Sequence, residues 1–304
     1  MGIYSEKDEK LDSFVSRAYE ALLKAGYIVN PDTFSEIPYG VGFKAGKSTY
    51  KKPESVTIYH SEKKGFSIVT HNAGIRALLS ALLTLKDQAG SDEAGKGDFF
   101  GPLVVCAFYA DPGDTEIFGQ KLTDSKGQSG KAVFEFFDFV KRKKTHNYSV
   151  VRIMPKRYNT LFADMQSQGK NTNHMLAWAH RKALSELDKK KKRKISSVVV
   201  DKFTSNIGLL NNIAGSIPDA DWHFEHRAEK NPLVAGASMI ARAEYLLSLK
   251  SLSRDFFSGN IELCSGSGVK AEGVLKEIAK HYPDNVLEHI CKMNFKTLKK
   301  VLKN

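Results

Sequence analysis

The first apolar pattern along the chain has the spacing of an amphipathic helix. Between Ser5 and Gly26, apolar side chains recur every three or four residues, and Ser5 and Asp8 have the spacing of a capping box. Short segments rich in β-branched and aromatic residues follow, namely EIPYGVGFKAG, SVTIYH and GFSIVT, before residues 73–86 return to helical spacing. We therefore expect a small antiparallel sheet with two helices, followed by a polar linker at residues 87–90.

The pattern changes after Gly90. Two apolar runs, PLVVCAFYA and SSVVVD, have the composition of buried strands, whereas residues 133–143, 173–187 and 234–250 have helical spacing. Strands that alternate with helices predict an α/β fold. The chain is thus expected to contain a small α+β domain over residues 1–86 and a larger α/β domain over residues 87–304.

Charge favours a polyanionic partner. The chain has 46 Lys and Arg against 34 Asp and Glu, which gives a formal charge of +12. Lysines concentrate in KKKKRK at 189–194 and in the last thirteen residues, where they either lie near a phosphate backbone or are simply solvated. The three cysteines form no CxxC pair, and no apolar run approaches the roughly 18 residues of a membrane span. We expect a cytoplasmic protein without disulfides or a cysteine zinc site.

The strongest chemical signal is the segment GSDEAGKGDFFGP, residues 90–102. Its adjacent Asp92 and Glu93 precede a strand-like apolar run, where two negative charges are costly unless cations bind. The segment also spells GxxxxGK, most of a phosphate-binding loop. However, Gly97 stands where a serine or threonine is required, and a helix is expected before the loop. A metal site is therefore the preferred interpretation.

Further acids follow in the second half of the chain. Asp201 ends the expected strand SSVVVD, at the edge where α/β folds place their sites, although an aspartate there also commonly caps a helix. Asp221, Glu225 and Glu229 precede the helix at 234–250, and alternation along one regular strand would put all three on the same face. The residue pattern does not choose among these three acids.

These motifs carry a family resemblance. SDEAGKGDFFGP resembles the DE-x-G-x-G-D-[YF]-F-G-P signature of ribonuclease HIII, and the aromatic pair before Gly101-Pro102 distinguishes it from the related HII enzymes. Other elements that resemble the family in the same order are LTDSK (122–126), RYNTLF (157–162), NTNHMLAWAH (171–180) and AEKNPLVAGASMIAR (228–242). The last is one residue shorter than in many type 2 enzymes. Upstream, IPYGVGFK and VTIYH resemble the family's N-terminal substrate-binding domain, which is similar to the TATA-binding protein repeat.

The resemblance implies a fold and an activity. The larger domain would have a ribonuclease H-like mixed sheet flanked by helices, and Asp92, Glu93, Asp201 and Glu229 would bind two Mg²⁺ or Mn²⁺ ions. The protein would then cut the RNA strand of RNA-DNA hybrids as a monomer, leaving 5'-phosphate and 3'-hydroxyl ends. Two alternatives stay open: HII-like cleavage at single ribonucleotides embedded in DNA, and a nucleic-acid-binding protein without catalysis.

Other residues of these motifs receive lesser roles. Gly95, Lys96 and Gly97 are expected to bring backbone close to the 2'-hydroxyl that distinguishes RNA from DNA. Lys126 and Arg242 either touch phosphates or are ordinary solvated charges, and Asp124 is expected in a turn. His180 is interpreted as a packed residue. The aromatic cluster is interpreted as core; it comprises Phe134, Phe136, Phe137 and Phe139.

Overall fold

The structure is a computed structural model, and it divides into two compact units. The described residues up to 84 belong to the first unit, those from 88 onward to the second, and each unit is described by itself. The structure describes residue 5 and residues 8–47, 53–62, 65–84, 88–109, 130–142, 148–190 and 194–302. No helix within these ranges is long and apolar enough to cross a membrane.

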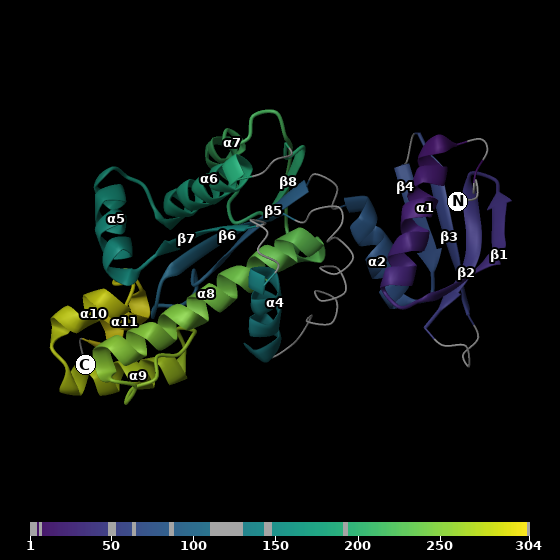
Figure 1. Cartoon of the computed structure of the whole chain (residues 1–304). Helices are drawn as coiled ribbons and strands as arrows, with labels where there is room; N and C mark the ends of the chain where they lie inside the picture. Colours follow the sequence, from purple (N-terminus) through teal and green to yellow (C-terminus); the bar gives the residue numbers. More distant parts are fainter. Residues whose placement is uncertain are drawn as a thin grey trace. The chain divides into compact units, whose positions relative to one another are not determined.

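The first unit is an antiparallel sheet with two helices (Figure 1). The strands run in the order β1 (Ile28–Ile37), β2 (Gly40–Gly46), β3 (Glu54–Ser61) and β4 (Gly65–Thr70). Helices α1 (Glu9–Lys24) and α2 (Ala73–Thr84) share one hydrophobic core with the sheet. Alternation places Val56 and Ile58 in this core, while Tyr59, the residue after Ile58, is exposed. This confirms the expected small α+β fold.

Two local details of this unit differ from expectation. Asp8 is not the third residue of a capping box but the N-cap itself, because its carboxylate accepts hydrogen bonds from the backbone of Lys10 and Leu11. Its second oxygen lies 2.5 Å from His60 Nδ1 on β3. The first strand also begins earlier than the pattern indicated, because Asn30, Pro31 and Asp32 carry no strand signal yet lie within β1.

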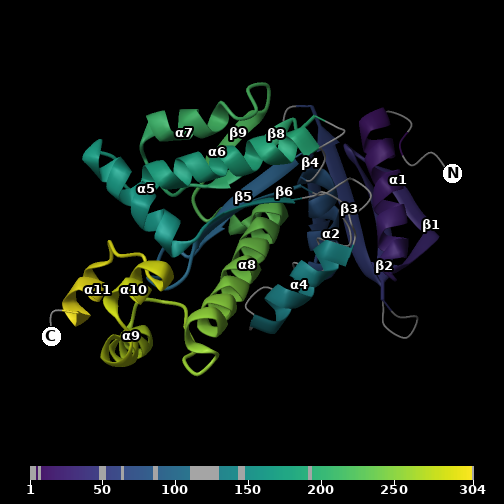
Figure 2. The same cartoon turned by 60° about the vertical axis from the view of Figure 1, so that its left-hand side comes forward.

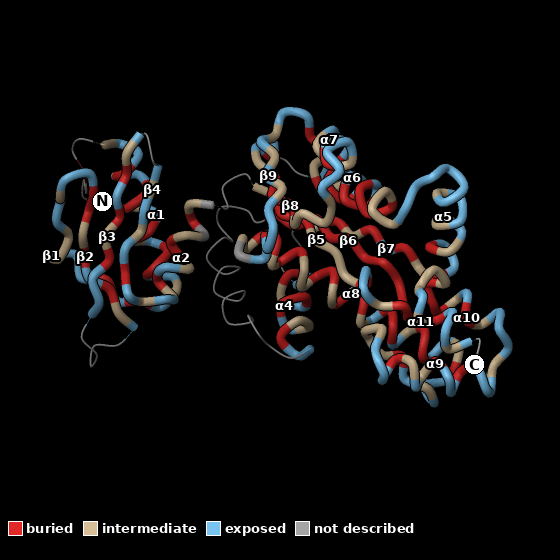
Figure 3. Tube along the Cα trace, turned by 180° about the vertical axis from the view of Figure 1, so that it is seen from behind, coloured by how far each residue is buried: buried red, intermediate tan, exposed pale blue. Residues whose placement is uncertain are grey.

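The second unit contains a mixed sheet in the order β7-β6-β5-β8-β9. Its strands are β5 (Gln88–Ala94), β6 (Leu103–Tyr109), β7 (Tyr148–Ile153), β8 (Ser197–Asp201) and β9 (Asp221–Glu225). β6 is antiparallel to both β5 and β7, whereas β8 runs parallel to β5 and β9 runs parallel to β8. The central strands are the most deeply buried part of the unit (Figure 3). The mixed sheet and its helices agree with the expected ribonuclease H-like fold.

Helices cover both faces of this sheet (Figures 1 and 2). One face packs against α6 (Thr172–Lys190) and is called the α6 face; α5 (Pro155–Ser167) and α7 (Ile207–Ala214) lie beside it. The other packs against the long α8 (Pro232–Phe257) and is called the α8 face; α4 (Gly130–Arg142) packs beside α8. The C-terminal part consists of α9 (Val269–His281), α10 (Asp284–Ile290) and α11 (Lys296–Val301).

The expected linker at 87–90 was wrong. Gln88, Ala89 and Gly90 form the start of β5, although QAGSDEA has a poor strand composition, because the strand is paired on both sides by β6 and β8. Gly90 is needed there, since a Cβ would come within 2.4 Å of the α8 backbone at Leu233 and Val234. β5 is a strand, which is what a phosphate-binding loop requires before its glycine turn. Gly97 nevertheless occupies the position where such a loop needs serine or threonine.

Candidate active site

Two acids follow the last pair of residues in the parallel pairing of β5 with β8. The β5–β8 pairing ends with Ser91 opposite Val200, so Asp92 and Asp201 follow one step beyond this last pair. Asp92 hydrogen-bonds Ser238 of α8, and Val199, two residues before Asp201, packs with Val234 of α8. Because side chains alternate along a strand, both carboxylates belong to the α8 face.

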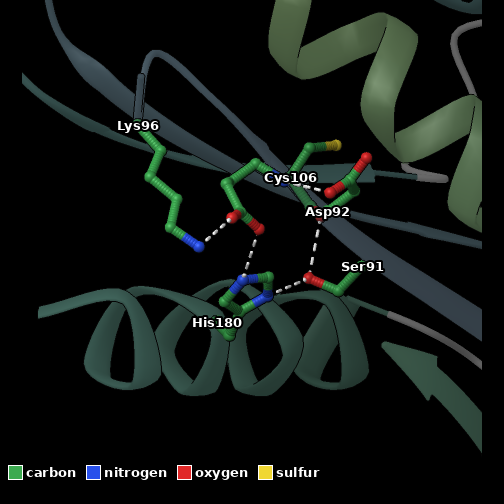
Figure 4. Close-up of polar contacts among 6 residues, drawn as sticks. Ser91, Asp92, Lys96, Cys106 and His180 are labelled. Carbon is green, nitrogen blue, oxygen red and sulfur yellow. Dashed lines mark hydrogen bonds and ion pairs between the residues drawn. The ribbon is translucent and has the colours of Figure 1, made fainter. Parts of the chain in front are cut away.

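Glu93 belongs to the opposite face. Its Oε2 lies 3.3 Å from His180 Nε2 on α6, and its Oε1 lies 3.3 Å from Lys96 Nζ (Figure 4). The Glu93 backbone N–H donates to Asp92 Oδ1 at 2.8 Å, which links the two neighbours through the strand itself. The Glu93 carboxylate is thus held by two cationic or donor groups on its own side of the sheet.

His180 is packed, as expected, but it is also part of this polar network. It is fully buried on α6 and stacks on Phe203, with ring centroids 5.2 Å apart. Its Nδ1 lies 2.8 Å from Ser91 Oγ, which itself donates to the carbonyl oxygen of Cys106 at 2.9 Å (Figure 4). Since that hydroxyl has one proton, His180 Nδ1 donates to Ser91. The contact with Glu93 was missed, although the two-residue spacing of Ser91 and Glu93 on a strand could have suggested one shared partner.

The pKa values of the two neighbouring carboxyl groups shift in opposite directions. Burial, together with the negative charge of Glu93, raises the pKa of Asp92 to about 7. Burial acts in the same direction on Glu93, but the hydrogen bond and charge of His180 and the charge of Lys96 outweigh it and lower the pKa of Glu93. Asp92 is therefore a half-buried carboxyl group whose ionised form is disfavoured by desolvation and by the charge of Glu93, and the charge of His180 offsets these effects only in part.

The three remaining candidate acids are separated by the structure. Asp221 pairs with Ser197, the first residue of β8, whereas Asp201 is the last residue of β8. Glu225 lies directly across from Asp201 in the parallel register. Glu229 lies in a 3-10 turn, η1 (Ala228–Lys230), which follows a left-handed residue at Arg227 with φ 58°.

The segment is therefore not one regular strand, and the alternation expected to place these acids on one face does not extend past Glu225. The backbone N–H of Ala228 donates to Asp201 Oδ1 at 2.9 Å, which brings the turn that carries Glu229 against Asp201. Both Glu225 and Glu229 thus stay candidates by geometry, whereas Asp221 is set apart from the others.

The donor chemistry of this region fits a hard divalent cation. Carboxylate oxygens are the preferred ligands of Mg²⁺, and a bound cation would offset the charge that raises the pKa of Asp92. Across the described ranges, no group of three or more His, Cys, Asp or Glu side chains is gathered closely enough to hold a metal ion. Asp92 and Asp201 are on one face, and Glu93 is bonded on the other.

The glycine turn between β5 and β6 is tightly built at one end and open in the middle. Gly95 has φ +87°, and a Cβ there would lie 2.2 Å from the carbonyl oxygen of Pro102 and 3.1 Å from the Tyr245 ring. A Cβ at Gly97 would meet nothing within 4 Å. Lys96 is exposed and lies 5.4 Å from the centre of the Phe203 ring. The turn therefore presents an open backbone at Gly97 on a fixed base at Gly95.

The other predicted contact residues have mixed outcomes. Arg242 Nη2 donates to Ser265 Oγ at 3.1 Å, and its guanidinium lies over the Tyr245 ring, so the structure gives it protein partners. Lys126 and Asp124 lie outside the described residues. Within KKKKRK, Lys194 pairs with Asp219 at 2.6 Å. Among the phenylalanines, Phe136 and Phe137 are buried, as expected of core residues.

Comparisons with known proteins support the family resemblance that the sequence motifs carry. A family model described as Ribonuclease HII matches residues 89–298. A ribonuclease HIII of Chlamydia muridarum is 29% identical over 300 residues, covering 93% of this chain and 92% of the relative. A ribonuclease HIII of Protochlamydia amoebophila is 32% identical over 221 residues, covering 72% of this chain and 70% of the relative.

Solved structures show the same fold. The crystal structure of Bst-RNase HIII in complex with Mn²⁺ has a TM-score of 0.62 at 22% identity and covers 97% of this chain and 96% of that chain. The structure of Aquifex aeolicus RNase H3 has a TM-score of 0.54 at 25% identity and covers 93% of this chain and 97% of that chain.

Proposed function

Since this chain belongs to the type 2 ribonuclease H family, on its ribonuclease HIII branch, we propose that it cuts the RNA strand of RNA-DNA hybrids with divalent metal ions. As a family member it is an endoribonuclease, a hydrolase. The proposal adds the substrate, the metal chemistry and the residues: Asp92, Glu93, Asp201 and Glu229 as metal ligands, with Gly95, Lys96 and Gly97 beside the substrate.

The observation that carries the proposal is the position of Asp92 beside Asp201. These carboxylates follow directly after the last pair of the parallel β5–β8 ladder, on the same face of the sheet. Burial and the Glu93 charge raise the pKa of Asp92 to about 7, which is the electrostatic state of a carboxyl group that a cation would stabilise. A protein that only bound nucleic acid would have no use for this costly arrangement.

Each residue of the site has a task in phosphodiester hydrolysis. Divalent ions held here would supply the activation of a water and the stabilisation of the departing 3' oxygen, which would give 5'-phosphate and 3'-hydroxyl ends. Asp92 and Asp201 would hold these ions from the α8 face. His180 and Lys96 favour the ionised form of Glu93, the form in which it would hold a cation.

Selectivity for RNA is assigned to the glycine turn. A 2'-hydroxyl both donates and accepts hydrogen bonds, and it is the group that distinguishes RNA from DNA at a given position. Gly97 leaves its backbone open because no atom would lie within 4 Å of a Cβ there. The exposed Lys96 beside it carries a positive charge that fits a phosphate backbone. The first unit, with Lys44 and Lys47 among its described residues, would add sequence-independent phosphate contacts.

A comparison of three duplexes tests the substrate. Purified protein in Mg²⁺ or Mn²⁺ is given a uniform RNA-DNA hybrid, a DNA duplex with one embedded ribonucleotide, and an all-DNA duplex of the same sequence. We expect cuts at several internal positions of the hybrid, 5'-phosphate ends, and an intact all-DNA duplex. Faster cutting at the single ribonucleotide would support the HII-like alternative, and no cutting of either RNA-containing duplex would support a binding protein without catalysis.

A further inference from the structure

A buried lysine from the C-terminal segment is bonded to the turn that follows the acidic pair. Lys292 lies between α10 and α11 and is only 1% exposed. Its Nζ donates to the carbonyl oxygens of Gly101 at 2.6 Å and of Phe100 and Pro102 at 3.3 Å each. An ammonium group has three N–H donors, and these three carbonyls use them all. Such burial excludes Lys292 from direct contact with a phosphate backbone, the role considered for the basic tail.

The backbone fixes the position of this lysine from two sides. Its own N–H donates to the Phe99 carbonyl at 2.7 Å, and the Gly101 N–H donates to the Ile290 carbonyl at 2.8 Å. On the other side, Asn159 of α5 donates to the Cys291 carbonyl at 2.9 Å and accepts from the Met293 N–H at 2.9 Å. The ammonium group is therefore held rigidly against the turn at residues 99–102.

The same turn supports the glycine that begins the substrate-facing loop. The carbonyl oxygen of Pro102, one of the three acceptors, is the atom nearest to the missing Cβ of Gly95, at 2.2 Å. Tyr245 adds a second tie, because its hydroxyl donates to the Phe100 carbonyl at 3.2 Å while its ring lies against Gly95. A shift of these carbonyls would therefore displace Gly95, which is two residues from Glu93.

We propose that Lys292 is a positioning residue, which fixes the carbonyls of residues 100–102 and through them the Gly95–Gly97 backbone that selects the RNA strand. This inference rests on the proposed function for its substrate. Lys292 contacts none of the four candidate metal ligands in the described structure, so it acts through the turn. Burial lowers the pKa of Lys292 to about 7, and the charge of Asp98 opposes this shift.

The test compares Lys292→Met with a matched control. Methionine keeps the length and most of the volume but provides no donor, so the carbonyls of Gly101 and Pro102 lose this hydrogen bond and the Phe100 carbonyl keeps only the Tyr245 hydroxyl. Leu298→Ala, at a buried position of α11, is the control, because it destabilises the same C-terminal segment without touching the turn. Both variants are measured well below their unfolding temperatures, by hydrogen exchange of the backbone amides and by cleavage kinetics on a uniform hybrid.

We expect Lys292→Met alone to speed exchange at the amides of Asp98 and Gly101, which donate within or from the turn. We also expect kcat on the hybrid to fall by about 10- to 100-fold, because a small displacement of a substrate-facing group has effects of this size. Equal exchange and equal kcat in the two folded variants would overturn the proposal and leave Lys292 with a role in stability alone.

A milder variant keeps the test decisive if Lys292→Met does not fold. Tyr245→Phe removes only the hydroxyl bonded to Phe100 and should also speed exchange at Gly101 and lower kcat, by less. Unchanged exchange and kcat in folded Tyr245→Phe would then overturn the proposal. If the wild-type protein does not cut hybrids, the proposed function fails, whereas the exchange measurements still decide whether Lys292 fixes the turn.

Discussion

His180 Nε2 lies 3.3 Å from Glu93 Oε2, so a fully buried histidine on α6 contacts one member of the acidic pair on β5. On its other side the same ring is bonded to Ser91, two residues earlier on the strand. The orientation of Glu93 is thus set by a residue that cannot reach the substrate itself.

Replacing His180 by Leu should weaken both metal binding and catalysis. Loss of a residue that orients a metal ligand typically reduces affinity or activity by about 10- to 100-fold. The measurement is Mn²⁺ affinity by calorimetry together with hybrid cleavage. Trp178→Ala, on the exposed side of the same helix, is the control and should behave like wild type. A folded His180→Leu protein with wild-type affinity and rate would contradict this role.

Asp92 should make metal binding depend on pH. Its pKa is raised to about 7, so the metal-free protein holds this proton below that pH and must release it when a cation binds. Apparent Mn²⁺ affinity should therefore fall by about tenfold per pH unit below pH 7. Calorimetry in buffers of different ionisation enthalpy should detect about one released proton near pH 6. Proton release that is absent in wild type, or equal in Asp92→Asn, would refute the assignment.

The same shift predicts a stability effect without metal. Because the folded pKa lies above the unfolded value of 3.8, the folded state holds a proton that the unfolded state has lost between these values. Stability contributed by protonated Asp92 is therefore present at low pH and is lost as pH rises towards 7. Asp92→Asn should raise the metal-free unfolding temperature at pH 8 more than at pH 4. An equal effect at both pH values would show that the pKa of Asp92 is not raised in the folded protein.

Two glycines of the turn should respond differently to alanine. Gly95→Ala should cost about 1–3 kcal/mol of stability, because φ is +87° and the Pro102 carbonyl occupies the space. Gly97→Ala should leave unfolding unchanged, since its Cβ would meet no atom within 4 Å, yet it should slow hybrid cleavage by blocking close approach of the 2'-hydroxyl. Denaturant unfolding and cleavage rates check both. Full activity of Gly97→Ala would remove the turn from RNA selection.

The fourth acid is predicted to be Glu229. Glu229→Gln keeps the side-chain size but removes the charge, so activity should fall by orders of magnitude while the protein stays folded. Asp221→Asn is the matched control, because Asp221 lies at the far end of β9, and it should cost little. Glu225→Gln decides the remaining ambiguity, since Glu225 is opposite Asp201. An inactive Glu225→Gln beside an active Glu229→Gln would move the assignment to Glu225.

The sequence indicated much of the fold because most elements have a clear period. The helices α4 and α6 and the strands β6 and β8 carry strong apolar patterns, and their bounds agree with the prediction within a few residues; α8 was also predicted, but it ends at Phe257 and not at residue 250. β5 was not predicted, because Gln88–Ala94 is polar and contains glycine. Its strand conformation is stabilised by pairing with β6 and β8 on its two sides. The break after Glu225 was likewise missed, because the left-handed residue at Arg227 has no signal in its side chain.

The candidate site was only partly predictable for a similar reason. Adjacent Asp92 and Glu93 were noticed as costly charges, but their assignment to opposite faces follows from β5 being a strand. For the basic tail that contains Lys292, the sequence leaves open contact with a phosphate backbone or simple solvation, because composition does not distinguish either from a lysine buried among backbone carbonyls. Contacts between segments distant in sequence, such as Lys292 with Gly101, require the folded structure.

The most direct test of the account is cleavage of a uniform hybrid by wild type and Asp201→Asn at matched Mg²⁺ concentrations, with circular dichroism to establish folding. The account predicts that wild type cuts the RNA strand, that excess chelator stops it, and that folded Asp201→Asn is inactive, because Asp201 and Asp92 both follow the last pair of the β5–β8 ladder. Cleavage that persists in excess chelator, or a folded Asp201→Asn protein as active as wild type, would contradict metal-dependent catalysis at this site.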